Sequence, residues 1–505
     1  MVVDVVPHNI GGEAVLPQAG ALLLPVHNPG TGEQIGQVAI ADEGLCHQAT
    51  QHALQAFKIW SKKSPIKRAQ VLFRFRALLE KNQDELAALV TREHGKTRED
   101  AKGSILRAIE VVELHCGALR ALQGDFSAQV ATGIDCWTTS EPLGVCVGVS
   151  PFNFPVMVPV WMMMPAIAAG NAFILKPSEQ TPSASNYLLG LLEEAGLPPG
   201  VVQILHGDKT TVDALLAEPD IAAFTAVAST PVAKAIYVEA TRQGKRAHTF
   251  GGAKNHAVVM PDADLNQTTQ ALIGAAFGSA GERCMAISAV VAVGDEIADA
   301  LVQQLKPKIE AIRVDIGDAA GVDMGPLISE AHRTRVLQAI TAGTEAGAAL
   351  LVDGRDFTHP KYPAGYFLGP SLFDNVTEAM DIYQQEIFGP VLVILRVKNF
   401  EEALALVNRN LYGNGTAIFT QSGYYAREYS QRVQVGMVGV NIPIPVPIAT
   451  HPFGGWKRSA FGDTNMHGAE SMHFYTRRKT VTARWFDTEQ AVTESFSMPT
   501  HQSEE

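Results

Sequence analysis

Short apolar runs alternate with amphipathic segments between residues 144 and 244. The apolar runs predict buried strands, and the segments with apolar residues at helical spacing predict helices. Four strands are predicted from these runs: 144–150, 172–176, 201–207 and 222–229. Helices are predicted at 186–196, 213–218 and 230–244. The alternation of strands with helices predicts a parallel sheet covered on both faces.

The second half of the chain repeats this pattern. Residues 256–260, 289–294 and 390–397 are short apolar runs, and a helical segment is predicted at 325–347. Earlier in the chain, residues 66–120 are rich in helix formers and predict two or three amphipathic helices. The pattern therefore indicates two α/β domains, which agrees with a length of 505 residues.

One uncharged stretch, from Pro142 to Leu175, is long enough to cross a bilayer. It contains prolines at 151, 155, 159 and 165, which would free backbone groups that lipid cannot satisfy. We interpret the stretch as a buried strand, a loop and a short buried helix.

Charge and cysteine content indicate which binding partners and which cellular compartment suit this protein. The net charge of −12 argues against nucleic acid as the partner. The five cysteines form no C-x-x-C pair, which favours a reducing compartment and gives no indication of a metal site. The first basic residue is Lys58, so no signal or transit peptide is indicated and a cytoplasmic protein is expected.

Two residues are candidates for reaction chemistry. Cys284 lies in the run "FGSAGERCMA", where Arg283 could favour the reactive thiolate, although most cysteines in such surroundings are inert core residues. Asn153 lies in "PFNFP", and its amide is either a loop cap or a donor directed at a developing oxyanion.

Three further segments are candidates for a nicotinamide cofactor, although the G-x-G-x-x-G motif is missing. Lys176 and Glu179 follow a buried strand, where ligands bind in open α/β sheets. Ser229 precedes a helix whose first N–H groups could hold a pyrophosphate. Glu386 precedes a Gly-Pro turn, and taken alone it would be a surface carboxylate.

The order of these motifs resembles the aldehyde dehydrogenase superfamily from about residue 20 to 485. The motifs that carry the resemblance are "PFNFP", "ILKPSE", "GLPPGVVQILHG", "FGSAGERC" and "EIFGPVL". Within the superfamily, "GGAKNHAVVMPDADL" and "VNIPIPVP" are similar to the CoA-acylating branch, the methylmalonate-semialdehyde dehydrogenases.

The resemblance implies a role for each candidate. Cys284 would be the nucleophile, and Asn153 would stabilise the oxyanion together with the Cys284 N–H. The residues implied to bind NAD are Phe152, Lys176, Glu179, Ser229, Glu386 and Phe388. Arg107, in the helix after "EHGKT", and Arg283 would bind the carboxylate of the semialdehyde, because a guanidinium matches a carboxylate bidentately. No metal is implied.

The main departure from the superfamily lies at residues 249–254. Hydrolytic members read Glu-Leu-Gly-Gly-Lys there, and the Glu activates water. This chain reads "TFGGAK", with Thr249 or Phe250 at the position of the Glu. A general base typically accelerates the attack of water about 10²- to 10⁴-fold. A thiolate needs less help, because it is already a good nucleophile. The missing carboxylate therefore agrees with CoA as the acyl acceptor.

The resemblance also implies the domain organisation. An NAD-binding domain would comprise residues 1–123 and 144–253, and a catalytic domain residues 254–455. A β arm at 124–143 and 456–490 would join two copies into a dimer or a dimer of dimers, a homotetramer. Residues 491–505 form a polar tail.

The activity implied is an NAD-dependent oxidation and decarboxylation of methylmalonate or malonate semialdehyde, giving propionyl-CoA or acetyl-CoA. Two alternatives remain open from the sequence. One is a hydrolytic aldehyde dehydrogenase that releases a free acid. The other is a non-redox protein, either a thiol acyltransferase or a scaffold.

Overall fold

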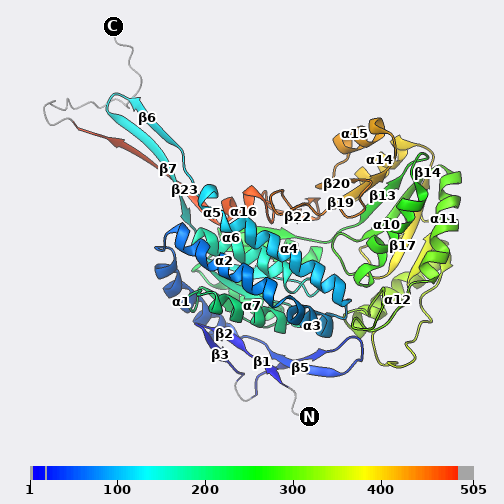
Figure 1. Cartoon of the computed structure of the whole chain (residues 1–505), viewed down its shortest axis with the longest axis horizontal. Coiled ribbons are helices and arrows are strands. Elements are labelled where there is room, and N and C mark those ends of the chain that lie inside the picture. The colour runs from blue at the N-terminus through cyan, green and yellow to red at the C-terminus, as the bar shows by residue number, and fades with distance from the viewer. Residues whose placement is uncertain (1–3, 18–19, 487–505) are drawn as a thin grey trace, which may run out of the picture.

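The computed structural model describes residues 4–17 and 20–486, and two open sheets organise it (Figure 1). The first sheet has the order β22-β12-β11-β8-β9-β10-β2-β3. Its strands are β22 (Ala460–Phe461), β12 (Arg246–Phe250), β11 (Ile221–Val227), β8 (Val145–Val149), β9 (Ala172–Lys176), β10 (Val202–Ile204), β2 (His8–Ile10) and β3 (Glu13–Val15). The five strands from β12 to β10 are parallel, and β22, β2 and β3 add antiparallel edges.

Alternate side chains of β9 point to opposite faces of this sheet, and helices cover each face. Phe173 and Leu175 belong to one core cluster, and Ala172 and Ile174 belong to another on the opposite face. The first cluster includes residues of α2 (Pro65–Lys81), α3 (Gln83–His94), α4 (Arg98–Cys116), α6 (Met157–Ala169) and α7 (Ser183–Glu194). The second includes residues of α1 (Glu43–Trp60), α8 (Lys209–Ala217) and α9 (Thr230–Arg242).

The second sheet has the order β15-β16-β17-β14-β13-β19-β20. Its strands are β15 (Ala349–Val352), β16 (Ser371–Asp374), β17 (Val391–Val397), β14 (Ile287–Val293), β13 (Asn255–Val259), β19 (Gly415–Phe419) and β20 (Met437–Val440). All neighbours are parallel except β15 and β16. The associated helices are α10 (Leu265–Phe277), α11 (Asp295–Glu310), α12 (Glu330–Glu345), α13 (Asp381–Gln384), α14 (Phe400–Arg409) and α15 (Gly423–Arg432).

A three-stranded antiparallel ribbon projects from the first domain (Figure 1). It consists of β6 (Phe126–Ala131), β7 (Ile134–Pro142) and β23 (Thr476–Arg484). The sequence-based assignment of 456–490 to this arm is wrong for its first part, because β22 pairs with β12 in the first sheet. Within the described part of this segment, β23 is the strand that joins the arm, where it pairs with β7, and α16 (Ala469–Phe474) precedes it. The predicted polar tail lies outside the described residues.

Three smaller elements complete the described fold. Strands β1 (Val5–Val6), β4 (Leu23–His27) and β5 (Gln34–Ala39) form a separate sheet. Strand β18 (Tyr412–Gly413) pairs with β21 (Trp456–Lys457). The short helix α5 (Ala118–Ala121) precedes the arm.

The uncharged stretch folds as the sequence predicted. It forms β8, a loop and α6, whose residues are all buried although Pro165 lies inside the helix. Among the described residues, every helix is too short or too polar to cross a membrane. The predicted helix at 325–347 starts only at Glu330, because Ser329 caps its N-terminus by accepting from the His332 N–H.

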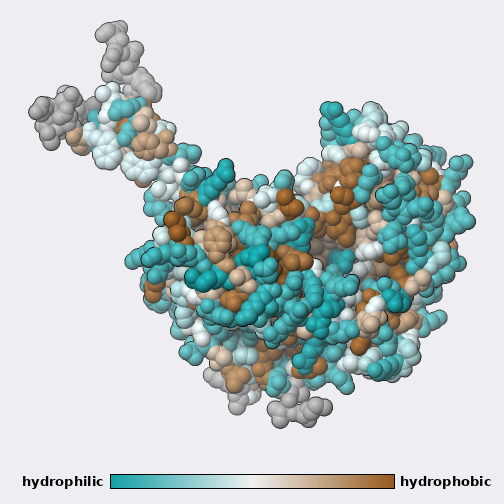
Figure 2. All heavy atoms as spheres, viewed as in Figure 1, coloured by the Kyte–Doolittle hydropathy of each residue, from teal (hydrophilic) through white to brown (hydrophobic). Residues whose placement is uncertain are grey.

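The space-filling view shows a hollow between the two domains, with hydrophobic residues on its rim (Figure 2). The segment after β20 is one source of exposed apolar side chains, which include Ile442 and Ile448. Most candidate functional residues come from the ends of strands and the loops that follow them in both domains, and Arg107 lies in helix α4.

Candidate functional site

The loops after three parallel strands of the first sheet carry candidate residues. Asn153 follows β8, Lys176 ends β9, and Ser229 follows β11. Because the carboxyl ends of parallel strands meet at one edge of a sheet, these residues lie along the same edge. Lys176 Nζ is buried and donates to Glu179 Oε2 at 3.2 Å. Ser229 is exposed at the N-terminus of α9.

The small residues before Cys284 permit an unusual backbone path. Ser279, Ala280 and Gly281 follow α10 with φ angles of 55°, 52° and 74°, in the left-handed region. A Cβ on Gly281 would lie 2.2 Å from the carbonyl oxygen of Gly389. The chain can therefore pass directly against the Gly-Pro turn at 389–390 only with glycine at this position.

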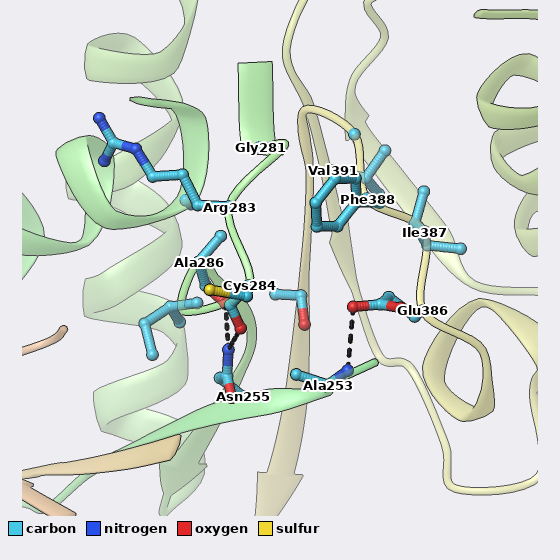
Figure 3. A pocket seen from close by; sticks show the side chains of 14 residues that line it. Ala253, Asn255, Gly281, Arg283, Cys284, Ala286, Glu386, Ile387, Phe388 and Val391 are labelled. Carbon is cyan, nitrogen blue, oxygen red and sulfur yellow. Dashed lines mark hydrogen bonds between the residues drawn. The ribbon is translucent and has the colours of Figure 1, made fainter. Parts of the chain in front are cut away.

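Cys284 is partly exposed and lines a pocket between the nucleophile loop and the turn at 386–391 (Figure 3). Its carbonyl oxygen accepts from the side-chain amides of Asn255 and Asn414, both at 2.9 Å. These two bonds fix the main chain at Cys284. Burial, with a smaller contribution from Glu386, raises the pKa of the thiol to about 12.

Asn153 lies beside the nucleophile loop. Its side chain is 3% exposed, and its Nδ2 donates to the carbonyl oxygen of Glu282 at 2.9 Å. The carbonyl oxygen of Asn153 accepts from Lys96 Nζ at 2.6 Å. The structure thus joins Asn153 to the segment that carries Cys284.

Glu386 and Phe388 line the same pocket as Cys284 (Figure 3). Glu386 is half-buried rather than a surface carboxylate, and its Oε1 accepts from the Ala253 N–H at 2.9 Å. Burial raises the pKa of this carboxyl. A Cβ on Gly252 would lie 2.2 Å from Glu386 Oε2, so the glycine leaves room for the carboxylate. Phe388 has a left-handed φ of 58°.

Neither residue at the position of the missing Glu offers a carboxylate to the thiol. Phe250 is 5% exposed and belongs to a core cluster against which Cys284 packs. Its ring meets the edge of His248 at 5.3 Å between centroids. Thr249 is buried, and its hydroxyl donates to the carbonyl oxygen of Ala233 at 2.8 Å.

Arg107 lies in helix α4, and Arg283 contacts the same helix. Arg283 Nη2 donates to Asp100 Oδ1 at 2.7 Å, and Nη1 donates to the Gly274 carbonyl. Arg107 pairs with Glu110 at 2.6 Å and donates to the carbonyl oxygen of Val446 at 2.8 Å. Asp100 and Arg107 are seven residues apart, about two helical turns, so both arginines engage one side of α4.

The suggestion that Arg283 favours the thiolate is not supported. The guanidinium points away from the sulfur (Figure 3). The cation that lowers the pKa of Cys284, against the larger effect of burial, is Lys96.

Four anchoring residues were not identified from the sequence. Lys96, Asn255 and Asn414 hold Asn153 and Cys284, as described above. Lys254 Nζ donates to the carbonyls of Ile382 and Gln385, at 2.7 and 2.9 Å, and so fixes the turn before Glu386. The sequence offers one sign of the two lysines: Lys96 in "EHGKT" and Lys254 in "GGAKN" each lie close after a glycine.

The raised pKa of the thiol predicts how fast Cys284 reacts with iodoacetamide. Because the thiolate is the reactive form, we expect the rate to rise about tenfold for each pH unit between pH 7 and 10. Mass spectrometry of the peptide that contains Cys284 would follow the reaction. A rate that levels off near pH 8 would contradict a pKa of about 12.

Comparisons with known proteins agree with this arrangement. The pattern of the "Aldehyde dehydrogenase family" matches residues 17–481. The chain is 51% identical to a malonate-semialdehyde dehydrogenase of Pseudomonas aeruginosa over 478 residues. The aligned region covers 95% of this chain and 96% of the relative. A malonate-semialdehyde dehydrogenase 2 of Bacillus thuringiensis (strain Al Hakam) is 46% identical to this chain. The aligned region covers 95% of this chain and 98% of the relative.

Solved structures show the same similarity. The methylmalonate-semialdehyde dehydrogenase of Oceanimonas doudoroffii superposes with a TM-score of 0.95 at 48% identity, covering 96% of this chain and 99% of the other. A protein of Sinorhizobium meliloti 1021, described as a methylmalonate-semialdehyde dehydrogenase complexed with NAD, gives the same TM-score and identity, covering 97% and 99%. The similarity predicted from the motifs is confirmed, and the chain belongs to the aldehyde dehydrogenase family.

Proposed function

We propose that this enzyme oxidises malonate or methylmalonate semialdehyde with NAD and transfers the acyl group to CoA. The observation that carries the proposal is the pocket that Cys284 and Glu386 both line, while neither Thr249 nor Phe250 supplies the hydrolytic carboxylate. The relatives named above support the class of substrate.

The residues at the edge of the first sheet fit NAD. Lys176 and Glu179 offer a donor and an acceptor for a ribose, and the exposed first turn of α9 offers N–H groups for a pyrophosphate. Glu386, held by the Ala253 N–H, would bind the second ribose, and Phe152 and Phe388 would pack beside it. When bound, NAD supplies the acceptor for the hydride of the substrate.

The reaction at Cys284 begins with attack of the thiolate on the aldehyde carbon. The negative charge moves to the aldehyde oxygen, where the Asn153 amide and the Cys284 N–H would stabilise it. Departure of the hydride then leaves an acyl group bound to Cys284 as a thioester.

The arginines would hold the substrate carboxylate. Hydrogen bonds to Asp100 and Gly274 use two N–H groups of Arg283, and its guanidinium carries further donors. Arg107 would bind from the neighbouring part of α4. The carboxylate then leaves as CO₂, the electron pair of the broken C–C bond passes into the enolate of the thioester, and a proton from water restores the acyl group. The thiolate of CoA takes this acyl group and releases Cys284 as a thiolate.

The arm and the cysteines complete the proposal. The exposed ribbon of β6, β7 and β23 would pair with a neighbouring copy, giving a dimer or a dimer of dimers. All five cysteines are free thiols, which agrees with a reducing, cytoplasmic setting.

Turnover should depend on CoA. With NAD and methylmalonate semialdehyde but no CoA, we expect one NADH per site in a burst, because no carboxylate at residue 249 or 250 activates water. Adding CoA should give steady turnover to propionyl-CoA. Stopped-flow absorbance of NADH and chromatography of the acyl product would measure both stages.

The same experiment separates the alternatives. Equal turnover to a free acid without CoA would support a hydrolytic enzyme. Failure to form NADH under any condition, with acyl transfer between thiols intact, would support a non-redox acyltransferase.

A further inference from the structure

Asp100 is a charged residue beside the nucleophile loop to which the proposed reaction gives no role. It lies in the first turn of α4, and its side chain is 18% exposed. Its Oδ1 accepts from Arg283 Nη2 at 2.7 Å, and its Oδ2 lies 3.8 Å from Lys96 Nζ. Burial alone would raise the pKa of Asp100, but Lys96 and Arg283 lower it, so this group is a carboxylate at neutral pH.

Three groups determine where the Arg283 guanidinium lies. The Asp100 carboxylate accepts from Nη2, and the Gly274 carbonyl, near the C-terminal end of α10, accepts from Nη1 at 3.3 Å. Gly278 provides the third contact, because a Cβ there would lie 2.6 Å from both Cζ and Nη2 of Arg283. The guanidinium therefore occupies the space that a side chain at 278 would fill, and it is directed away from the Cys284 sulfur (Figure 3).

This placement leaves hydrogen-bond donors for a ligand. Within the described part of the chain, Asp100 and Gly274 use two of the five N–H groups of the guanidinium, which leaves three. Arg283 also lines the pocket of Cys284, so a small ligand bound there can meet these donors. Asp100 thus holds one edge of the guanidinium and leaves the rest of it available.

The charges around Asp100 favour a ligand that carries one carboxylate. Two largely buried cations, Lys96 and Arg283, share the single carboxylate of Asp100. Glu282 adds no negative charge, because burial raises its pKa well above the ordinary range. The cluster therefore has one positive charge in excess, and a buried charge without a partner is costly. A substrate carboxylate at Arg283 would balance it, whereas an aldehyde without a carboxylate would not.

We propose that Asp100 is a positioning residue that determines specificity: its carboxylate holds the Arg283 guanidinium where it receives the carboxylate of the semialdehyde. Asp100 acts through Arg283 and does not contact the substrate, because two carboxylates repel each other. This inference rests on the proposed role of Arg283 in binding the substrate carboxylate. Loss of Asp100 should therefore affect aldehydes that carry a carboxylate more than aldehydes that lack one.

The substitution Asp100→Ala tests the proposal when malonate semialdehyde is compared with propanal, an aldehyde of the same length without a carboxylate. The NADH burst without CoA isolates thioester formation, and its dependence on aldehyde concentration gives a second-order rate constant for each aldehyde. In D100A the ratio of the constant for malonate semialdehyde to that for propanal should fall about 10- to 100-fold, since misplacement by about 1 Å costs on this order. Equal losses for both aldehydes, or an unchanged ratio, would overturn the proposal.

Two further variants separate orientation from charge and from folding. Asp100→Asn keeps an oxygen that accepts from Arg283 Nη2, so the ratio should stay within about fivefold of the wild type, although a neutral acceptor forms a bond of roughly half the strength. Gly278→Ala leaves Asp100 intact and displaces the guanidinium, which is the end of a flexible side chain, so this variant should fold and lower the ratio as D100A does. G278A decides the question if D100A does not fold. An unchanged ratio in G278A, or a ratio in D100N as low as in D100A, would contradict positioning by Asp100.

Glu99→Ala is the matched control, and Arg283→Met separates this inference from the proposed function. Glu99 is the exposed neighbour of Asp100 in the first turn of α4, so its loss removes the same charge from the same helix end. E99A should keep the wild-type ratio, and a fall equal to that in D100A would overturn the proposal. In R283M/D100A the ratio should be no lower than in R283M alone, because the guanidinium that Asp100 positions is absent. An unchanged ratio in R283M would refute the proposed role of Arg283, whereas a lower ratio in R283M with an unchanged ratio in D100A would refute only the role of Asp100.

Discussion

Replacing Cys284 with serine should abolish both the NADH burst and steady turnover, with a loss of at least about 10⁴-fold. A hydroxyl is far less ionised and less nucleophilic than a thiol. Removal of a covalent nucleophile typically lowers the rate by at least about 10⁴-fold. Stopped-flow absorbance at saturating NAD and semialdehyde would measure the burst, and mass spectrometry would detect the acyl-enzyme on wild-type Cys284 alone.

The matched control for this substitution is Cys136→Ser. Cys136 lies on β7 of the arm, where its sulfur accepts from the Thr482 hydroxyl at 3.6 Å. We expect this variant to keep the wild-type burst and turnover. A burst of ordinary size in C284S would show that another group carries the acyl intermediate.

Replacing Asn153 with alanine should lower the burst rate constant by about 10²- to 10³-fold, the usual cost of removing one oxyanion donor. The Michaelis constant for NAD should change little, because Lys176 and Glu179 are untouched. Pre-steady-state kinetics with varied NAD and varied semialdehyde would separate the two effects.

The Asn153 amide also contributes a buried hydrogen bond, so the stability of the variant needs a control. Its loss is expected to cost about 1–3 kcal/mol of unfolding free energy, measured by denaturant titration. A burst rate within tenfold of the wild type in a folded N153A would contradict the assigned role.

Much of the first domain could be predicted from sequence because its strands are short, apolar and bounded by turns. The predicted strands at 144–150 and 172–176 are confirmed as β8 and β9, and the helix at 186–196 as α7. Parallel pairing of the two strands follows from the intervening helix. The sequence placed Lys176 at the end of a buried parallel strand, and the structure has it at the end of β9.

The anchoring residues could not be predicted, because their partners are distant in sequence. Lys96 reaches the carbonyl of Asn153 across 57 residues, and Glu282 lies beside His94 from the other domain. Neither a charge pattern nor a helical period indicates which buried polar groups will meet. The direction of the Arg283 side chain likewise depends on Asp100, which belongs to helix α4, far away in the sequence.

The packing of Phe250 bears on how the acyl acceptor could change in evolution. A glutamate at this position would bury a charge within the apolar cluster around Cys284, and such a charge is costly without a partner. The neighbouring rings, His248 among them, would need to be replaced at the same time. A single substitution of Phe250 by glutamate would therefore destabilise the fold, so the proposed preference for a thiol over water would be maintained by the hydrophobic core as well as by the chemistry of the pocket.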